Sequence, residues 1–357
     1  MDIENTLQTI LEKTLQANGS DVYIIPGAPV TTKIDDKLHP LTDDRLTTGD
    51  CTAILQQIYH LAHERPISRL ESEGDDDFSF GLAKIGRFRC NAFKQRGTLA
   101  AVLRVVPFQL PDPSRLGIPP AVLELGKLRR GMVLVTGPAG SGKSTTLSCI
   151  IDRINTDSTG HIITLEDPIE FIHPHRNCLV TQREIMNDTR SFAYALRSAL
   201  RQAPDVILLG EMRDFETIQT ALTAAETGHL LLSTLHTVGA SKTIDRIVDS
   251  FPATQQAQVR MQLSLVLRAV VSQQLIPAIQ GGMVPAFEIM QVDNAIANMI
   301  REGKVHQMDN AIYAGASQGM ITMDNDIFRL YREGIITREN ALLYAMNPDV
   351  LGKKMTL

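Results

Sequence analysis

A glycine-rich octapeptide near the middle of the chain constrains the fold on both of its sides. It reads Gly137-Pro138-Ala139-Gly140-Ser141-Gly142-Lys143-Ser144. The apolar residues 132–136 precede it, and Leu147, Ile150 and Ile151 follow at helical spacing. The octapeptide matches the pattern G-x-x-x-x-G-K-[ST], which forms a turn between a buried strand and a helix. We therefore expect a strand, a tight loop and a helix in this order.

The octapeptide has the chemistry of a phosphate-binding loop. Glycines let the backbone fold closely around phosphate oxygens, and the amides at the start of a helix point at a bound anion. We expect residues 137–145, which end at Thr145, to bind ATP, with Lys143 on its β- and γ-phosphates and Ser144 on Mg²⁺. The alternative is a glycine-rich turn that binds nothing. The lysine, the hydroxyl and the flanking elements together favour the nucleotide.

Further apolar segments alternate with helical stretches after residue 120. The expected strands are 132–136, 161–165, 206–209 and 230–234. Short, continuously apolar strands separated by helices are typical of a mostly parallel sheet with both faces covered. The sequence predicts an α/β fold for this region.

Two of these strands end in acidic residues. Glu166 follows one strand, with Asp167 and Glu170 close behind, and Glu211 follows another. Carboxylates at the carboxyl edge of such a sheet lie where Mg²⁺ binds beside a phosphate-binding loop. The alternatives are a solvated loop with Asp167 as a helix cap, and an exposed acid of the kind that ends many strands.

Two histidines flank the strand at 230–234. His229 precedes it and His236 follows it. Lone histidines often have only ordinary hydrogen bonds, so the pattern leaves a structural role open beside a functional one.

A smaller domain precedes the phosphate-binding loop. Residues 5–17 and 48–62 have helical periodicity, and residues 21–25, 31–34, 77–82, 87–93 and 99–106 are strand-like. A proline cluster follows at Pro107, Pro111, Pro113, Pro119 and Pro120. Because such a density prevents a continuous helix or central strand, we expect domains at 1–106 and 121–357, joined by a linker at 107–120.

Composition excludes several classes of protein. The formal charge is −5, with 35 Lys and Arg against 40 Asp and Glu, which disfavours a general polyanion binder. The four cysteines form no C-x-x-C pair, so neither zinc spacing nor a dense disulfide framework is expected. The acidic start, Met1 to Asn5, lacks the features of a signal peptide, and no apolar run reaches the roughly 18 residues of a membrane span. We expect a chain that stays in the cytoplasm.

Taken together, the motifs resemble those of the type II/IV secretion ATPases, and most closely the retraction ATPases of type IV pili. They are the octapeptide with Thr145-Thr146, then Glu166-Asp167-Pro168-Ile169-Glu170-Phe171, Gly210-Glu211-Met212-Arg213-Asp214, Ala225-Glu226-Thr227-Gly228-His229 and Leu235-His236-Thr237. The resemblance extends from Gly19-Ser20-Asp21 to the segment 295–308.

This resemblance implies a homohexamer built from an N-terminal PAS-like α+β domain and a RecA-like P-loop ATPase domain with a helical C-terminal part. In that family's pattern Glu166 polarises the attacking water, Glu211 is the acid on the magnesium side, and His236 and His229 sense the γ-phosphate. Arginines that reach the nucleotide would come from Arg87, Arg89 and Arg104, for which a solvated strand face is the alternative.

The resemblance also implies a function and a place. The hexamer would hydrolyse ATP to retract pili by acting on an inner-membrane platform protein, at the cytoplasmic face of that membrane. The absence of a four-cysteine zinc site favours retraction over assembly. Ala297 replaces an arginine that the family has in a late motif, so a noncatalytic paralogue that regulates a working retraction ATPase stays open. A RecA-like nucleic-acid translocase is disfavoured, because tryptophan is absent and aromatic residues make up 5% of the chain.

Overall fold

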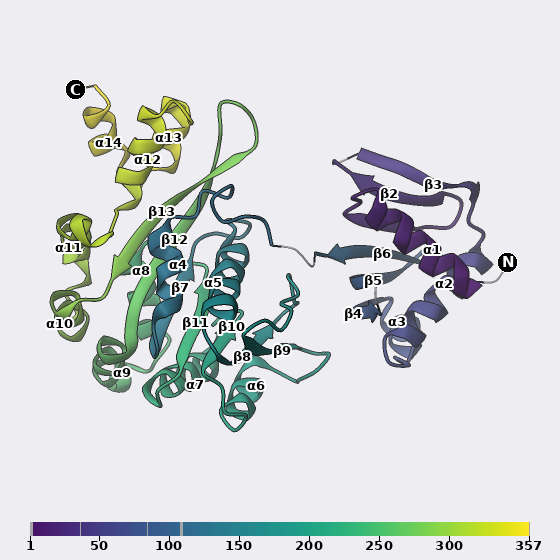
Figure 1. Cartoon of the computed structure of the whole chain (residues 1–357), viewed down its shortest axis with the longest axis horizontal. Coiled ribbons are helices and arrows are strands. Elements are labelled where there is room, and N and C mark those ends of the chain that lie inside the picture. Colours follow the sequence, from purple (N-terminus) through teal and green to yellow (C-terminus); the bar gives the residue numbers. More distant parts are fainter. Residues whose placement is uncertain (1–2, 36, 84, 108–109, 357) are drawn as a thin grey trace. The chain divides into compact units, whose positions relative to one another are not determined.

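The computed structural model describes residues 3–35, 37–83, 85–107 and 110–356. The chain divides into two compact units, Met1–Gln109 with Glu170–Ile172, and Leu110–Ile169 with His173–Leu357. Residues 108–109 of the expected linker lie outside the described residues. The predicted mixed α/β fold is confirmed, and the described part of each unit has its own sheet (Figure 1).

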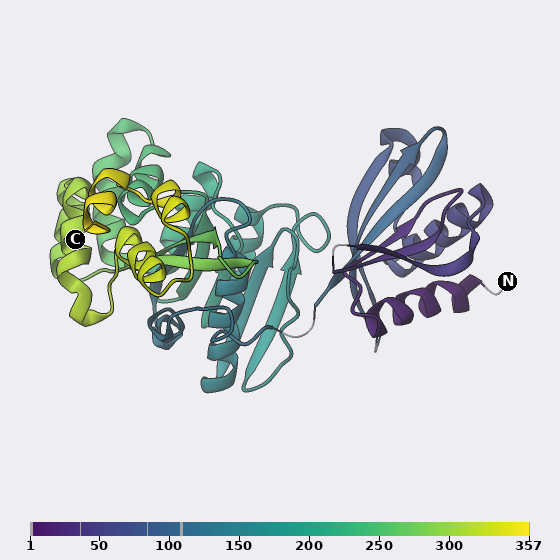
Figure 2. The same cartoon turned by 90° about the horizontal axis from the view of Figure 1, so that it is seen from above.

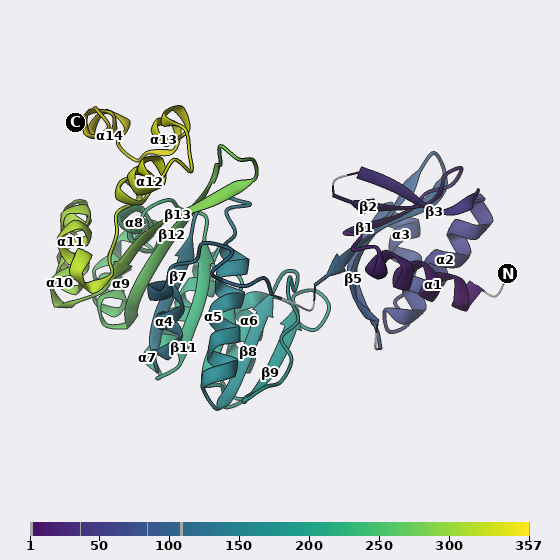
Figure 3. The ribbon, with the colours of Figure 1, turned by 45° about the horizontal axis from the view of Figure 1, so that its top comes forward.

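The first unit is a helix-covered antiparallel sheet. Its elements are α1 (Ile3–Gln16), β1 (Asp21–Ile24), β2 (Pro29–Ile34), β3 (Lys37–Arg45), α2 (Thr48–Leu61), α3 (Ser68–Glu73), β4 (Asp75–Leu82), β5 (Gly86–Gln95) and β6 (Thr98–Val106). The strand order is β3-β2-β1-β6-β5-β4, and all neighbours run antiparallel. Helices gather on one side of this sheet (Figure 3).

Alternation along β5 explains why only one face of this sheet is apolar. Phe88 and Cys90 are fully buried and pack in the core with residues of α1 and α2. Arg87 and Arg89 alternate with them, so they point to the other face. Arg104 on β6 is the cross-strand partner of Arg89 and shares that face. The sheet therefore has an apolar face toward the helices and a face with three arginines.

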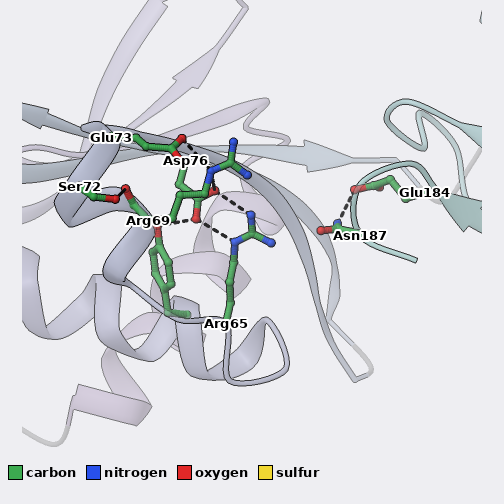
Figure 4. A network of polar contacts seen from close by, with 8 residues as sticks. Arg65, Arg69, Ser72, Glu73, Asp76, Glu184 and Asn187 are labelled. Carbon is green, nitrogen blue, oxygen red and sulfur yellow. Dashed lines mark hydrogen bonds and ion pairs between the residues drawn. The ribbon is translucent and has the colours of Figure 1, made fainter. Parts of the chain in front are cut away.

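A buried ion pair links the segment between α2 and α3 to the sheet of the first unit. The Asp76 side chain on β4 is fully buried, and both of its oxygens accept hydrogen bonds from Arg65, at 2.7 and 2.8 Å (Figure 4). Tyr59 Oη donates to the same carboxylate at 3.0 Å, and Arg69 Nε lies 3.9 Å from it. Although burial raises the pKa of Asp76, the hydrogen bonds from Arg65 and Tyr59 bring it below its usual value.

The second unit is larger and is built on a mostly parallel sheet. Its elements up to the last parallel strand are α4 (Pro120–Glu124), η1 (Leu125–Lys127), β7 (Gly131–Thr136), α5 (Lys143–Asp157), β8 (Gly160–Glu166), β9 (Cys178–Glu184), α6 (Phe192–Ala199), β10 (Val206–Leu209), α7 (Phe215–Glu226), β11 (Leu230–Leu235), α8 (Ala240–Asp249), α9 (Ala253–Val266) and β12 (Leu267–Pro277). They are followed by β13 (Met283–Gln291), α10 (Asn294–Glu302), η2 (Val305–Gln307), α11 (Met308–Ala314), η3 (Gly315–Gln318), α12 (Met323–Arg332), α13 (Arg338–Tyr344) and α14 (Pro348–Lys354).

The strand order in this sheet is β13-β12-β7-β11-β10-β8-β9. All neighbouring pairs are parallel except β12 and β13. Side chains of α5 cover one face, while α6, α7, α8 and α9 cover the other. Because both faces are covered, every residue of β7, β10 and β11 is buried, as the apolar runs predict.

The C-terminal helices α12, α13 and α14, drawn in yellow, gather beside β12 and β13 (Figures 1 and 2). Met323, Ile327 and Leu330 of α12 pack in a core with Ile276 of β12 and Ala286 of β13. Asp326 on α12 accepts a hydrogen bond from the amide of Phe287 on β13, at 2.8 Å. The helical C-terminal part is therefore attached to the edge of the sheet.

Several elements have no counterpart in the sequence predictions. They are β3, α3, β9, β12 and β13. The edge strand β3 is exposed or half-buried along its whole length and contains Pro40, so it has no apolar alternation. Helix α9 ends at Val266 and β12 begins at the next residue, so no turn sequence separates helix from strand.

Candidate nucleotide-binding site

The glycine-rich loop connects β7 to α5 as predicted. Gly137, Gly140 and Gly142 have positive φ angles of 144°, 74° and 84°. A Cβ atom at Gly137 would lie 2.1 Å from the carbonyl oxygen of Gln273, so no larger residue fits there. Helix α5 then starts at Lys143, and its first-turn amides have no partners within the helix. This arrangement forms a loop around the positive end of a helix dipole.

Lys143 lies back over the loop from the first turn of α5. Its Nζ atom donates to the carbonyl oxygens of Gly137, at 3.0 Å, and Pro138, at 2.8 Å, and the residue is only 8% exposed. Among the described residues, the buried hydroxyl oxygens of Ser141 and Thr136 have no hydrogen-bond partner. A buried cation, the N-terminus of a helix and the unpaired buried hydroxyls of Ser141 and Thr136 fit an anion such as a phosphate chain.

Glu166 is the last residue of β8 and is 7% exposed. Its Oε1 atom accepts hydrogen bonds from Thr164 Oγ1, at 2.6 Å, and Gln182 Nε2, at 3.3 Å. The Gln182 Oε1 atom in turn accepts the amide of His173 at 2.8 Å. Burial lowers the pKa of His173 to about 4, so this ring is neutral at pH 7. The Oε1 atom of Glu166 is thus held by a hydroxyl and a side-chain amide.

Glu211 follows β10 and forms a cluster with an arginine and a histidine. Its Oε2 atom lies 2.6 Å from Arg213 Nε and 3.5 Å from His236 Nε2. The Glu211 side chain is 11% exposed, whereas those of Arg213 and His236 are 71% and 51% exposed. The ends of β10 and β11 are tied together by Thr234 Oγ1, which donates to the Gly210 carbonyl at 2.6 Å. The carboxylate is fixed and its partners are free to move into solvent.

Four of the predicted site segments meet at one edge of the sheet. In the parallel register, Leu235 pairs with Thr136, and Leu209 pairs with both Ser233 and Leu165. Glu166 is the last residue of one of these strands, and the glycine-rich loop, Glu211 and His236 follow the carboxyl ends of the others. This edge is where open parallel sheets bind their ligands.

His229 is not brought to this edge. It precedes β11, and its carbonyl oxygen accepts the amide of Gly131 at the start of β7. Its Nδ1 atom lies 3.1 Å from both Ala224 O and Thr227 Oγ1. A six-residue strand, about 20 Å long, separates it from the loop of its own domain. The structure thus places His229 at the amino end of β11, away from the loop of its own domain, and its role as a sensor of the γ-phosphate stays a prediction.

The three predicted arginines belong to the first unit. Arg89 Nη2 lies 3.1 Å from Asp77 Oδ2, and Arg104 Nε lies 2.8 Å from Asp21 Oδ1. Their side chains are 40% and 69% exposed, and that of Arg87 is on the same face of the sheet. The structure thus places the three together, each within reach of solvent or of acids of its own unit.

A cavity of about 380 Å³ adjoins the first turn of α5. Gly142, Thr145 and Thr146 line it on the side of the loop, and Gln273 contributes the floor beside them. The remaining lining residues are Ser114, Arg115, Leu116, Gly117, Ile118, Leu275, Met283, Val284 and Pro285. The cavity has the size and the mixed polar and apolar lining of a site for a nucleoside next to its phosphates.

Sequence reasoning missed several of the residues that shape the site. Arg213, Gln182 and Gln273 are polar residues in motifs or strands whose contacts depend on the folded sheet. Of these three residues, only Arg213 could have been recognised from the sequence, because it lies two residues after an acid at a strand end. Gln273 had none, since no strand was predicted at β12.

The residues present fit a nucleotide and a divalent cation. Lys143 and the loop amides suit phosphate, while the Ser144 hydroxyl and the Glu211 carboxylate are the oxygen donors that Mg²⁺ takes. The fold and the loop together define a P-loop nucleotide-binding domain.

Comparison with known proteins gives the family. The model of the type II/IV secretion system protein family matches residues 1–336. The chain belongs to this family. The type IV pilus retraction ATPase PilT of Pseudomonas aeruginosa is 46% identical over 340 residues, which are 95% of this chain and 98% of PilT.

Two further relatives agree with this assignment. The type IV pilus ATPase PilU of Pseudomonas aeruginosa is 40% identical over 346 residues, 97% of this chain and 89% of PilU. A crystal structure of the pilus retraction motor PilT with bound ADP has a TM-score of 0.88 and 46% identity, and the match covers 97% of this chain and 98% of that one. Within the part of the chain that the structure describes, no helix combines the length and apolarity of a membrane span.

Proposed function

We propose that the chain is an ATP-hydrolysing motor that powers type IV pilus retraction. The observation that carries this proposal is the convergence of the phosphate-binding loop, Glu166, Glu211 and His236 at one sheet edge. The similarity to PilT over 95% of the chain supports the choice of retraction among the activities of P-loop proteins.

The proposal extends to assembly and place. The first unit is a PAS-like domain and the second a RecA-like ATPase domain with a helical C-terminal part, with the boundary in the proline-rich segment 107–120. The chain forms a homohexamer, lies in the cytoplasm at the pilus base, and acts on an inner-membrane platform protein. The similarity to PilU supports a paralogous retraction ATPase as a further partner.

Each site residue has a defined chemical task in this proposal. Lys143 exchanges its loop carbonyl partners for phosphate oxygens, and the amides of residues 137–145 bind the same phosphates. Ser144 and Glu211 would hold Mg²⁺, which would supply positive charge beside the phosphates. Glu166 orients the attacking water and takes its proton, because its carboxylate is already fixed by Thr164 and Gln182. His236 contacts the γ-phosphate beside Glu211.

In this proposal the arginine face of the first unit completes the nucleotide site of a neighbouring subunit. Arg87, Arg89 and Arg104 lie together on one face of the sheet. A guanidinium spreads its charge over several phosphate oxygens, which suits the transition state of phosphoryl transfer. We expect these arginines to contact a nucleotide bound by a neighbouring subunit of the hexamer.

Purified variants test the enzymatic part. Lys143→Ala should lower both ATP affinity and turnover by more than a hundredfold, because the loop loses its only buried cation among the described residues. Glu166→Ala should lower turnover by about 10² to 10⁴ while ATP binding changes little, since a general base acts on the chemical step. The exposed Lys127→Ala is the matched control and should behave as the wild type. Normal steady-state turnover by both site variants would overturn the assignment.

A deletion strain tests the biological part. Complementation with the wild type should restore pilus retraction and normal surface piliation, whereas Glu166→Ala should leave the cells with excess pili that do not retract. Full retraction in the deletion strain would argue against the motor function even if the purified protein hydrolyses ATP.

An accessory paralogue is the second candidate. It is supported by the 40% identity to PilU and by Ala297 on α10, at the position of a family arginine. Absence of ATP turnover in the purified wild type, together with stimulation of a retraction ATPase on mixing, would favour this role.

A further inference from the structure

Two adjacent polar residues lie inside the sheet on β12, next to the phosphate-binding loop. Ser272 is fully buried and Gln273 is 3% exposed. Neighbouring side chains of a strand point to opposite faces, so the two make contacts on different sides of the sheet. Polar side chains are seldom buried in a central strand unless they have defined partners.

Gln273 contacts the loop itself. Its Oε1 atom accepts a hydrogen bond from Thr146 Oγ1 on α5, at 2.7 Å. Its backbone carbonyl and its Nε2 atom lie against Gly137 and Gly142, where added Cβ atoms would approach them to 2.1 and 2.9 Å. This strand therefore supports both ends of the loop.

Ser272 contacts the segment that follows His236. The amide of Gly239 donates to Ser272 Oγ at 2.9 Å, in a fully buried hydrogen bond. The next amide, that of Ala240, donates to Glu288 Oε1 at 2.8 Å. Glu288 is the cross-strand partner of Ser272 on β13, so the two side chains hold consecutive amides of one segment. We call residues 236–239 the His236 loop.

Glu288 also holds the start of α12. Its second oxygen, Oε2, accepts the amide of Met323 at 3.4 Å, and the residue is 4% exposed. One buried carboxyl group thus accepts amides at the N-termini of two helices, α8 and α12; burial raises the pKa of Glu288, and the hydrogen bonds from the Ala240 and Met323 amides partly offset this rise. No described residue gives Glu288 a basic partner in an ion pair.

We propose that Ser272 and Glu288 are positioning residues for His236, and that Glu288 couples the position of the His236 loop to α12. The proposal rests on the function proposed above, because it gives the His236 loop a nucleotide to respond to. A shift of the loop moves the Ala240 amide, and the shared carboxylate must then change its bond to Met323. Through α12 the change reaches α13 and α14, which pack on it.

A contiguous chain of contacts is not by itself evidence of coupling, so the test must measure coupling directly. The chain has no tryptophan, and Phe328 on α12 is half-buried, with Lys354 Nζ 4.4 Å from its ring centre. A Phe328→Trp protein therefore carries a single tryptophan, whose selectively excited emission reports on α12. Its emission is compared without nucleotide, with ADP and with a nonhydrolysable ATP analogue.

We expect the Phe328→Trp protein to change its emission on binding the ATP analogue. Adding Glu288→Gln or Ser272→Ala should abolish this change, leave the KM for ATP within about threefold, and lower kcat by about tenfold, because a small misplacement of a catalytic group affects turnover more than binding. The matched control is Ser264→Ala, which removes a buried hydroxyl that bonds only within α9, to the Met261 carbonyl.

Each outcome decides the proposal. The proposal would be overturned if both variants changed their emission as much as the parent Phe328→Trp protein does. It would also be overturned if the parent protein showed no change. If Glu288→Gln fails to fold, Ser272→Ala gives the decision. A parent protein that binds the analogue with an emission change but does not hydrolyse ATP would overturn the proposed motor function. It would leave the coupling between the His236 loop and α12 intact.

Discussion

At the scale of single residues, Asp76 shows how strongly the fold depends on a pair that the sequence does not reveal. Its carboxylate is fully buried and accepts three short hydrogen bonds from Arg65 and Tyr59. A buried charge without its partner is costly, so such a pair is far more damaging to break than an exposed one. Asp77, the next residue, makes an exposed pair with Arg89 instead.

Asp76→Asn should therefore destabilise the first unit by about 3 kcal/mol, whereas Asp77→Asn should cost less than about 1 kcal/mol. Hydrogen exchange of the β4 and β5 amides in the whole chain measures both effects. Equal exchange rates in the two variants would contradict the assignment of the buried pair.

The effect of Asp76 should depend on pH with a defined sign. The pKa of Asp76 is lowered in the folded state. Its contribution to the free energy of unfolding is therefore complete above the unfolded pKa of about 3.9, and it is lost as the pH falls through the folded pKa. The difference in the free energy of unfolding between wild type and Asp76→Asn should thus be constant from about pH 5 to 8 and should shrink in more acidic buffer.

Motif chemistry explains which single residues could be predicted. The loop, Glu166, Glu211 and His236 were recognisable because each follows an apolar strand, and parallel strands bring their carboxyl ends together. His229 flanks the same strand at its amino end, so the rule that ligands bind at the carboxyl ends does not place it with the loop. Gln273 and Glu288 depend on strand pairing between distant segments, which local sequence does not encode.

At the scale of elements, the loop between β7 and α5 is shaped by the strand beside it. Gly137 has no room for a Cβ because of the Gln273 carbonyl on β12, whereas Gly140 has nothing within 4 Å of its Cβ position. Both have positive φ angles, so backbone strain alone does not distinguish them.

Gly140→Ala should cost roughly 1 kcal/mol, the usual strain of alanine at positive φ, and Gly137→Ala should cost at least twice as much because the loop must also move away from β12. Thermal unfolding without nucleotide measures the two variants in parallel. A larger loss for Gly140→Ala would show that contact with β12 does not limit the loop.

The elements that escaped prediction share a physical cause. Helix α9 continues into β12 without a breaker, and β9 alternates buried Cys178 and Val180 with the strongly exposed Leu179. In both segments tertiary pairing with the sheet, and not local propensity, decides the conformation. The buried central strands were predictable because coverage on both faces leaves a continuous apolar run.

At the scale of the whole molecule, the arginine face and the loop belong to different units of the chain. If arginines of one subunit contact the nucleotide of another, nucleotide binding must favour assembly, because a ligand stabilises the state that binds it best.

Sedimentation velocity should therefore show hexamers at about tenfold lower protein concentration with a nonhydrolysable ATP analogue than without it. Replacing both Arg89 and Arg104 with alanine should remove most of this gain. The matched control Arg153→Ala, an exposed arginine paired with Asp157 on α5, should keep it. If hexamers formed at the same protein concentration with and without the nucleotide, this result would contradict the proposed role of the arginines.

The strand order fixes the distance between the phosphate-binding loop and Glu211 at the edge where the site lies. Because β11 lies between β7 and β10, the loop and Glu211 are separated by two strand spacings, about 10 Å in all. His236 follows β11, the strand between them, and its Nε2 atom already lies 3.5 Å from the Glu211 carboxylate. No single side-chain substitution shortens this separation, because it is set by the backbone spacing of the strands.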